Sequence, residues 1–256
     1  MNQITKNRFI GFSVALLVIV GGVLLYSRQQ STPNFNAQKA QNLQSENYNP
    51  SVSPSNFTTE INNIFFSIKP GQKTVFEAKT PNGTEKIVIT IEKNTKNVAG
   101  FETLIYHDQV YIDNVLKEDT RDYLAQHKKT GDVWYFGEEV DNYENGTLKD
   151  HHGTFLHGTD GAEAGIWIKA NQNVGDSYRQ EYYKGQAEDM QNVVAIDQTV
   201  KTAKATYTGC VKLYAWTPLD KQSQEFKYNC PEINGEVLIE NQIEGKRTEL
   251  VSITKP

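Results

Sequence analysis

Acidic side chains in the second half of the chain are the first candidates for chemistry. Glu181 lies in the segment SYRQEYY, and Glu188 and Asp189 follow it closely. Two carboxyl groups held about 5 to 9 Å apart can act as acid and base in hydrolysis. Arg179 shares a strand face with Glu181, however, and this favours a structural row of ion pairs. We therefore assign no catalytic residue and keep a hydrolase using Glu181, Glu188 or Asp189 as an alternative.

A cluster of histidines suggests a metal site. The segment HHGTFLHGTD can direct imidazole and carboxylate ligands to zinc or copper if Gly153 lets the chain fold back. Adjacent histidines on a strand point to opposite faces, which favours a solvated polar loop instead. The metal site is thus a secondary hypothesis, and we expect no cofactor. Its candidate ligands are His151, His152, His157 and Asp160.

Aromatic and acidic residues lie together in DVWYFGEEVDNYEN, which runs from Asp132 to Asn145. Such a combination can hold a cation or the face of a sugar. A half-buried strand with an acidic rim is the simpler interpretation of the same pattern. For ligand binding, the sequence nominates Trp134, Tyr135, Glu138, Arg179 and Glu181.

Familiar enzyme motifs are absent from the sequence. It contains no G-x-S-x-G, H-E-x-x-H, Walker A, G-x-G-x-x-G or EF-hand motif. The formal net charge is −5 and the pI is near 5.6, so the chain lacks the basic surface that nucleic acids require. We therefore expect a non-enzymatic protein that does not bind nucleic acid.

Two cysteines, Cys210 and Cys230, flank a turn signal, PLDKQ. A hairpin centred on Asp220 pairs residues whose numbers sum to 440, which sets the two cysteines opposite each other. Opposed Cα atoms of antiparallel strands lie about 4.5 to 5.5 Å apart, a distance that a disulfide can bridge. The sequence therefore predicts a cross-strand disulfide, with two reduced, buried thiols as the alternative.

The elements that position these residues are predicted to be β-strands. In EKIVITIEK, for example, Ile87, Ile89 and Ile91 project to one face of a strand. No long helical repeat separates the strands, so the fold class is mainly β: one antiparallel, curved sheet or sandwich with little helix. A short helix in GQAEDMQNVV is possible. Type I′ hairpin turns are expected at Asn82-Gly83, Asn145-Gly146 and Asn234-Gly235.

An apolar stretch near the N-terminus predicts one transmembrane helix. Phe9 to Tyr26 carries no charge and is long enough to span a bilayer as a helix. Lys6 and Arg8 precede it, so the positive-inside rule places residues 1–8 in the cytoplasm and the rest of the chain outside. A cleaved signal peptide is the alternative, but no A-x-A-like site follows the stretch. We expect a single-pass protein of the cell membrane whose helix 9–26 is a signal anchor.

Two further segments follow the predicted helix. Residues 27–56 are rich in Gln, Asn, Ser and Pro, which predicts a flexible tether. Residues 57–256 are the extracytoplasmic domain, in which 22 basic and 30 acidic residues leave a net charge near −8. A domain of this charge is repelled by anionic lipid, so we expect membrane contact through the helix alone.

Four segments of the outer domain stand in a characteristic order and spacing: VWYFGEEVDNYENG, DGAEAGI, VGDSYRQEYYKGQAED and CVKLYAWTPLD. Together they resemble motifs of uncharacterised extracytoplasmic, membrane-anchored domains of prokaryotic envelope proteins. The resemblance covers much of the chain from Phe65 to Ile253 and implies an outer, mainly β domain. It implies no activity and transfers no catalytic residue, and the histidine cluster is not part of it.

The predicted topology and the missing motifs favour a non-enzymatic domain. We expect it to bind a small ligand or an envelope partner through the concave side of its sheet. The alternatives are an envelope hydrolase, using the carboxylates or the histidine loop, and a structural or assembly subunit. A structure separates them by showing which of the nominated residues converge in a closed pocket.

Overall fold

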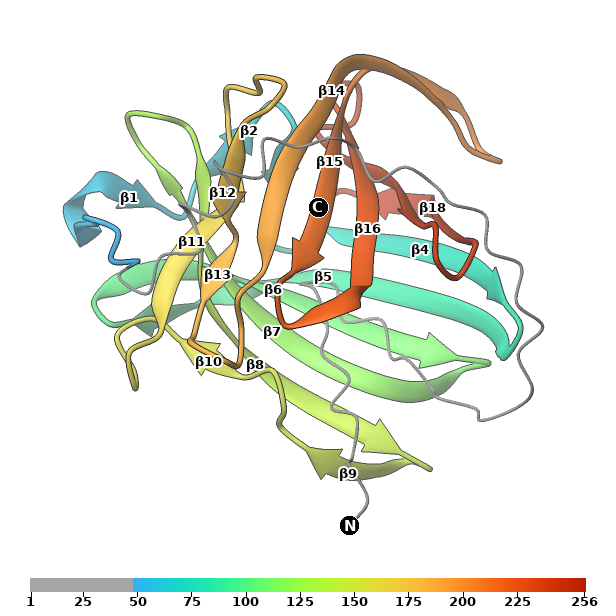
Figure 1. The fold of residues 1–256 in the computed structure, drawn as a ribbon, viewed down its shortest axis with the longest axis horizontal. Coiled ribbons are helices and arrows are strands. Elements are labelled where there is room, and N and C mark those ends of the chain that lie inside the picture. The colour runs from blue at the N-terminus through green and yellow to red at the C-terminus, as the bar shows by residue number, and fades with distance from the viewer. Residues whose placement is uncertain (1–47) are drawn as a thin grey trace.

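The computed structural model describes residues 48–256, which fold almost entirely into β-strands (Figure 1). Within this range the helical element is the short 3-10 turn η1, Pro54–Asn56. The predicted transmembrane helix, the cytoplasmic N-terminus and the tether up to residue 47 lie outside the described residues. Among those described, no helix has the length and apolar character needed to cross a bilayer.

Sixteen strands form one antiparallel sheet, and two more form a separate hairpin, β2–β3. Along the main path the order is β12-β14-β15-β16-β17-β18-β4-β5-β6-β7-β8-β11-β13. The strands are β1 (Phe57–Thr58), β2 (Ile61–Asn63), β3 (Phe66–Ile68), β4 (Lys73–Thr80), β5 (Gly83–Val98), β6 (Phe101–Ile112), β7 (Val115–His127), β8 (Val133–Glu144), β9 (Thr147–Asp150), β10 (Phe155–Leu156), β11 (Glu163–Ile168), β12 (Ser177–Arg179), β13 (Glu181–Tyr182), β14 (Met190–Lys201), β15 (Thr206–Thr217), β16 (Asp220–Cys230), β17 (Gly235–Asn241) and β18 (Lys246–Thr254).

The two ends of this sheet are joined by the chain itself. β12 and β13 lie at opposite ends of the path, yet only Gln180 separates them in sequence. The sheet is therefore a nearly closed barrel, which confirms the mainly β, antiparallel, curved prediction and excludes the sandwich. Gly165 on β11 lies against this crossing, where a Cβ atom would stand 2.2 Å from the carbonyl oxygen of Gln180. The closure thus requires glycine at that position.

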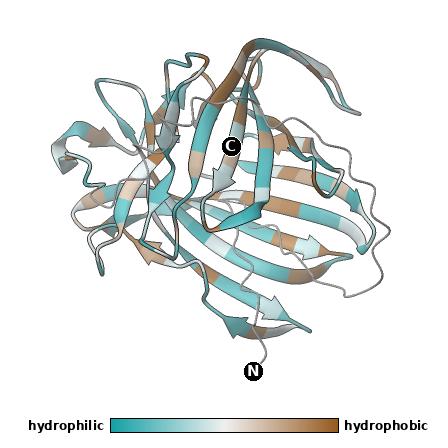
Figure 2. Cartoon of the chain, viewed as in Figure 1, coloured by the Kyte–Doolittle hydropathy of each residue, from teal (hydrophilic) through white to brown (hydrophobic). Residues whose placement is uncertain are grey.

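Local sequence explains most of the strands. Ile87, Ile89 and Ile91 on β5 are at most 2% exposed, as the alternation predicts, and Figure 2 shows brown and teal segments alternating along many strands. The turn at Asn145 and Gly146 has the expected positive φ angles of 52° and 76°. The turn at Asn234 differs: Cys230 pairs with Gly235, so residues 231–234 form a four-residue loop instead of a two-residue turn.

The possible helix in GQAEDMQNVV is wrong. Gly185 lies in a turn that Glu188 stabilises by accepting a hydrogen bond from the Gly185 N–H at 2.6 Å. β14 then begins at Met190 and pairs with both β12 and β15. The apolar residues of this segment are thus buried by neighbouring strands, and tertiary pairing overrides the helix propensity of the sequence.

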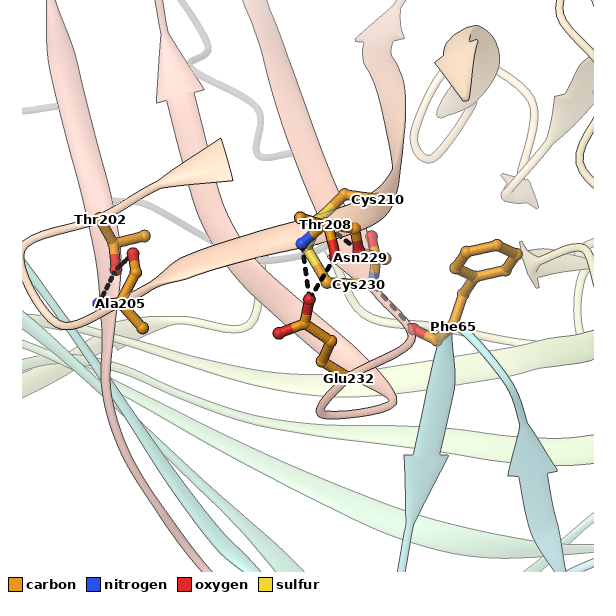
Figure 3. Close-up of a disulfide and its surroundings, with 8 residues drawn as sticks. All are labelled: Phe65, Thr202, Ala205, Thr208, Cys210, Asn229, Cys230 and Glu232. Carbon is orange, nitrogen blue, oxygen red and sulfur yellow. Dashed lines mark hydrogen bonds between the residues drawn. A yellow bond between two sulfur atoms is a disulfide. The ribbon is translucent and has the colours of Figure 1, made fainter. Parts of the chain in front are cut away.

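The disulfide prediction is confirmed, because Cys210 on β15 and Cys230 on β16 are bonded with a Cα–Cα distance of 4.1 Å (Figure 3). The ladder pairs Val211 with Asn229, the register that sums to 440. The register changes at a bulge beside Thr217, which pairs with Asp220, and this allows a tight turn to join the two strands. Both cysteines are fully buried.

Two apolar cores flank strands β6, β7 and β8. The larger one fills the interior of the barrel. The smaller one, called here the outer cluster, covers the opposite face of these strands beneath β1 and consists of Phe57, Val98, Phe101, Ile105, Tyr123, Ala125, Phe136 and Ala164.

The β2–β3 hairpin bridges two sides of the barrel. The Asn62 N–H donates to Oε1 of Gln126 on β7 at 2.8 Å, and the Ser67 N–H donates to the carbonyl of Asn234 at 2.7 Å. The ring of Phe66 packs inward, 5.9 Å from the ring of Trp167 between centroids. The hairpin therefore covers the interior from one side.

Candidate functional site

A cavity lies in the barrel interior beneath the β2–β3 hairpin. About 50 Å³ of it is open to the centres of water molecules, which is room for about three to five waters or a ligand of similar size. Aromatic and aliphatic groups form part of the wall, and polar groups from β14, β16, β17 and the barrel crossing form the rest. The lining includes Phe66, Tyr106, Trp167, Leu213, Gln72, Gln180, Gln191, Lys227, Asn229 and Glu236.

A chain of side-chain hydrogen bonds ends at this cavity. The Tyr178 hydroxyl donates to Oε1 of Gln191 at 2.8 Å, and Nε2 of Gln191 donates to Oε1 of Gln180 at 2.8 Å. Nε2 of Gln180 is buried without an acceptor among residues 48–256. Gln180 is 1% exposed and is the residue that joins β12 to β13. The closure of the barrel therefore places an unused donor in the cavity wall.

Lys227 brings a positive charge to the same wall. It is 3% exposed, on β16, and its charge opposes the burial that raises the pKa values of the neighbouring acids. Burial raises the pKa of Asp122 to about 7 and that of Glu236 to about 8. Both groups are thus part protonated near neutral pH, and their ionisation responds to any charge that enters the cavity.

Strands β6, β7 and β8 carry an acidic wall next to the cavity, made of Asp108, Glu118, Asp122 and Glu138. All four side chains are at most 7% exposed. Asp122 and Glu138 are direct cross-strand partners, and the Tyr135 hydroxyl donates to Oδ1 of Asp122 at 2.6 Å. Burial and the mutual repulsion of these groups raise the pKa values of Asp108 and Glu138 well above the ordinary range.

Three of the five residues nominated for ligand binding meet at this wall. Glu138 belongs to it, Tyr135 donates a hydrogen bond to its Asp122, and the charge of Glu181 contributes to the raised pKa of Glu138. Trp134 points to the outer cluster instead, with its ring 5.9 Å from that of Phe57. The alternation of a strand sends neighbouring residues to opposite faces, so Trp134 and Tyr135 cannot serve one site.

Arg179 also lies apart from the acidic wall. Its guanidinium is stacked on the ring of Tyr182 at 4.4 Å and faces the ring of Tyr48 at 5.5 Å. The Tyr48 hydroxyl donates to the carbonyl of Ala164 on β11 at 3.0 Å. Burial lowers the pKa of Arg179. This aromatic arrangement holds the last part of the predicted tether against the barrel crossing.

The histidine segment does not gather its four candidate ligands. Nδ1 of His151 lies 2.7 Å from Oδ1 of Asp141, whereas Nδ1 of His157 lies 3.2 Å from a carboxylate oxygen of Glu163. Asp160 lies in a turn with a φ angle of 51°. In the described part of the chain, no three His, Cys, Asp or Glu side chains are placed to hold a metal ion. In the predicted set, His151 and His157 thus have separate carboxylate partners, and His152 donates its backbone N–H to Oδ1 of Asp150.

Of the three carboxylates nominated for hydrolysis, Glu188 differs in its surroundings from Glu181 and Asp189. Glu188 stabilises its own turn through the Gly185 N–H. Asp189 and Glu181 are 2% and 3% exposed, and the backbone carbonyl of Asp189 accepts from the Gln180 N–H at 2.8 Å. Glu181 and Asp189 are thus both packed in the interior of the protein.

Sequence reasoning missed Gln180, Gln191, Lys227, Glu236 and the acids of β6 and β7. A signal for some of them exists: Asp108 lies between Tyr106 and Val110 at the same parity of one strand, where an apolar residue is expected. A charged residue at a strand position that alternation predicts to be buried conflicts with the local pattern, and such conflicts are often found at functional sites.

Comparison with known proteins identifies no family. No family model and no curated protein matches the chain. Among solved structures, the chain is similar to a crystal structure described as that of a "putative lipoprotein from Parabacteroides distasonis", with 12% sequence identity and a TM-score of 0.37. That match covers 74% of this chain and 98% of the other.

Proposed function

We propose that the domain is a binding protein that holds a small polar molecule in the barrel interior. The observation that carries the proposal is Nε2 of Gln180, a fully buried donor without an acceptor in the described structure, in the wall of a cavity. Buried polar groups in folded proteins are almost always hydrogen-bonded, because an unused one costs about 1 to 3 kcal/mol. A bound molecule with an acceptor atom removes that cost.

We also propose that the domain is held outside the cytoplasmic membrane by the helix from Phe9 to Tyr26. The disulfide between Cys210 and Cys230 supports this location, since such bonds persist in oxidising compartments. Protease added to intact cells should release the domain by cutting between residues 27 and 47. Protection of the domain until the cells are lysed would contradict the proposed orientation.

Native mass spectrometry of the full chain, extracted from membranes in detergent, tests the binding function. We expect the wild-type chain to carry an added small mass. Leu213→Phe, which enlarges a side chain in the cavity wall, should lose this mass, whereas Glu60→Gln, at an exposed position, should keep it.

Two results together would contradict a binding role. The first is a wild-type chain with no added mass. The second is an unchanged tryptophan fluorescence spectrum when the protein meets a panel of small polar compounds, since Trp167 lines the cavity and reports on its occupation. A far-ultraviolet dichroism spectrum of each variant checks that the fold is kept.

A further inference from the structure

We infer that the cavity takes a small primary amine, bound as its ammonium ion, that also carries a hydroxyl or carbonyl oxygen. This inference rests on the proposed function and names the chemical class of its ligand. Three features of the cavity point to this class: its balance of charges, the atoms that have no hydrogen-bond partner, and the aromatic rings of its wall.

The charges around the cavity favour a cation. The ammonium group of Lys227 is the shared positive neighbour of four buried carboxyls, those of Asp108, Asp122, Glu225 and Glu236. Glu118 adds a further acid beside Asp108. Buried charges are stable when they are paired, and Lys227, with Lys246 as a second neighbour of Glu225, provides fewer positive charges than the set has carboxyls. A further ammonium group, supplied by a ligand, would favour the ionised form of these acids and pair with it.

An acceptor atom without a donor favours an amine that has N–H groups. Oε1 of Glu236, a residue of the cavity wall, has no hydrogen-bond partner within the described range. A primary ammonium ion offers three N–H donors, whereas a quaternary ammonium ion offers none. A metal ion is a poorer occupant, since residues 48–256 contain no group of three side chains placed to bind one.

The donor of Gln180 requires that the same ligand carries an oxygen. Its Oε1 already accepts from Gln191, which fixes the amide so that Nε2 is the free end. A hydroxyl or carbonyl oxygen two or three bonds from the ammonium nitrogen can accept from this N–H inside a cavity of about 50 Å³. Both ends of such a ligand are then hydrogen-bonded.

Aromatic rings cover the remaining wall. The rings of Phe66, Tyr106 and Trp167 all line the cavity and lie 5.6 to 6.0 Å apart between centroids. Such rings pack on the methylene groups of a small ligand, and their faces attract its positive charge. The wall thus suits a short alkyl chain next to an ammonium group.

Isothermal titration calorimetry of the full chain in detergent tests the inference with matched probes. The probes are 2-aminoethanol, propan-1-ol, in which a methyl group replaces the ammonium group, and ethylamine, which lacks the hydroxyl. We expect 2-aminoethanol to bind most tightly and propan-1-ol about ten- to hundredfold more weakly, because hydrogen bonds to charged groups are lost. Ethylamine should bind more weakly by about tenfold or less.

Variants assign the contacts. Glu236→Gln keeps the shape of the side chain but removes its charge and should weaken 2-aminoethanol binding about tenfold or more. Glu60→Gln is the matched control on an exposed side chain and should have no effect. Binding of the amine should also release protons, seen as a dependence of the measured heat on the buffer, because an ammonium ion favours the ionised form of the acids.

The outcomes separate this inference from the proposed function. Propan-1-ol or acetate binding as tightly as 2-aminoethanol would overturn the amine class and leave a binding cavity. No heat with 2-aminoethanol at concentrations up to about 100-fold above the protein would also overturn it, and the native mass measurement then decides separately whether the cavity holds any ligand. The comparison of probes on the wild-type chain stands even where Glu236→Gln fails to fold.

Discussion

The two faces of strands β6, β7 and β8 are both buried, but their chemistry is opposite. On one face the outer cluster packs aromatic rings, with Phe136 5.2 Å from Phe57 and 4.4 Å from Phe101 between centroids. On the other face the strands carry Asp122 and Glu138 into the barrel interior. Apolar burial stabilises a fold, whereas buried acids cost stability. The outer cluster therefore stabilises the fold, whereas the interior acids lower its stability and lie near the cavity that we propose binds a ligand.

The largest expected effect lies in the outer cluster. Phe136 is fully buried and stacks on Phe101, so Phe136→Ala removes a ring from a packed site. We expect the free energy of unfolding to fall by about 3 to 5 kcal/mol, measured by urea denaturation at pH 7.

A surface variant provides the control for this measurement. Leu148 on β9 is 45% exposed, so Leu148→Ala should change the stability by less than about 0.5 kcal/mol. A cost below about 1 kcal/mol for Phe136→Ala would show that the outer cluster is not the stabilising face.

The interior acids should make the protein less stable as the pH rises from 5 to 8. Burial raises the pKa of Asp122 from 3.8 to about 7 and that of Glu236 from 4.5 to about 8. At pH values between the ordinary pKa and the raised pKa of each group, the folded state binds more protons than the unfolded state. These groups therefore stabilise the fold at low pH and lose that effect as the pH rises. We expect the contribution of each of these groups to the free energy of unfolding to fall by on the order of 2 to 4 kcal/mol between pH 5 and pH 8.

Two variants sharpen this test. Asp122→Asn should flatten the slope, whereas Phe136→Ala should lower the stability at every pH and keep the slope. Acids whose pKa is lowered, such as Asp119, titrate below this window and do not disturb it. Stability that rises steadily from pH 5 to pH 8 would mean that the interior acids are ionised and paired.

Removal of the disulfide should lower the stability by no more than Phe136→Ala does, and this loss should not depend on pH. The bond between Cys210 and Cys230 mainly restricts the unfolded chain, so Cys210→Ala in the oxidised protein should cost about 2 to 4 kcal/mol. A disulfide contains no ionisable group, so the dependence of the free energy of unfolding on pH should not change. A variant that loses the slope together with the bond would show that the disulfide positions the acidic wall.

Sequence patterns predicted what depends on local periodicity. The buried face of β5, the turn at Asn145 and Gly146 and the pairing of Cys210 with Cys230 all follow from spacing along one hairpin or strand. The closure of the barrel at Gln180 could not be predicted in this way, because it joins strands that are at opposite ends of the sheet path. The site depends on that closure.

The structure brings together only some of the residues nominated for ligand binding. Tyr135 and Glu138 have opposite parity in β8, but the irregularity at Gly137, where φ is 131°, shifts the register so that both reach the interior. Trp134 was grouped with them by sequence proximity, although strand alternation sends it to the other face. Lys227 and Gln180 come from distant strands, and no local pattern links them to β8.

The smallest expected effect is that of Asp108→Asn. Asp108 is 3% exposed, burial raises the pKa of its carboxyl well above the ordinary value, and its Oδ1 has no partner in the described chain. Burial thus favours the neutral form of the side chain, and asparagine replaces it with a neutral group of the same shape. We expect a change in the free energy of unfolding below about 1 kcal/mol, in either direction, by urea denaturation at pH 7. Because ionisation of the buried wild-type acid costs stability, Asp108→Asn should gain in relative stability as the pH is raised. A cost above about 2 kcal/mol at pH 7 would instead show that Asp108 is ionised and paired, and the two faces of β6 would then differ in chemistry but not in their contribution to the fold.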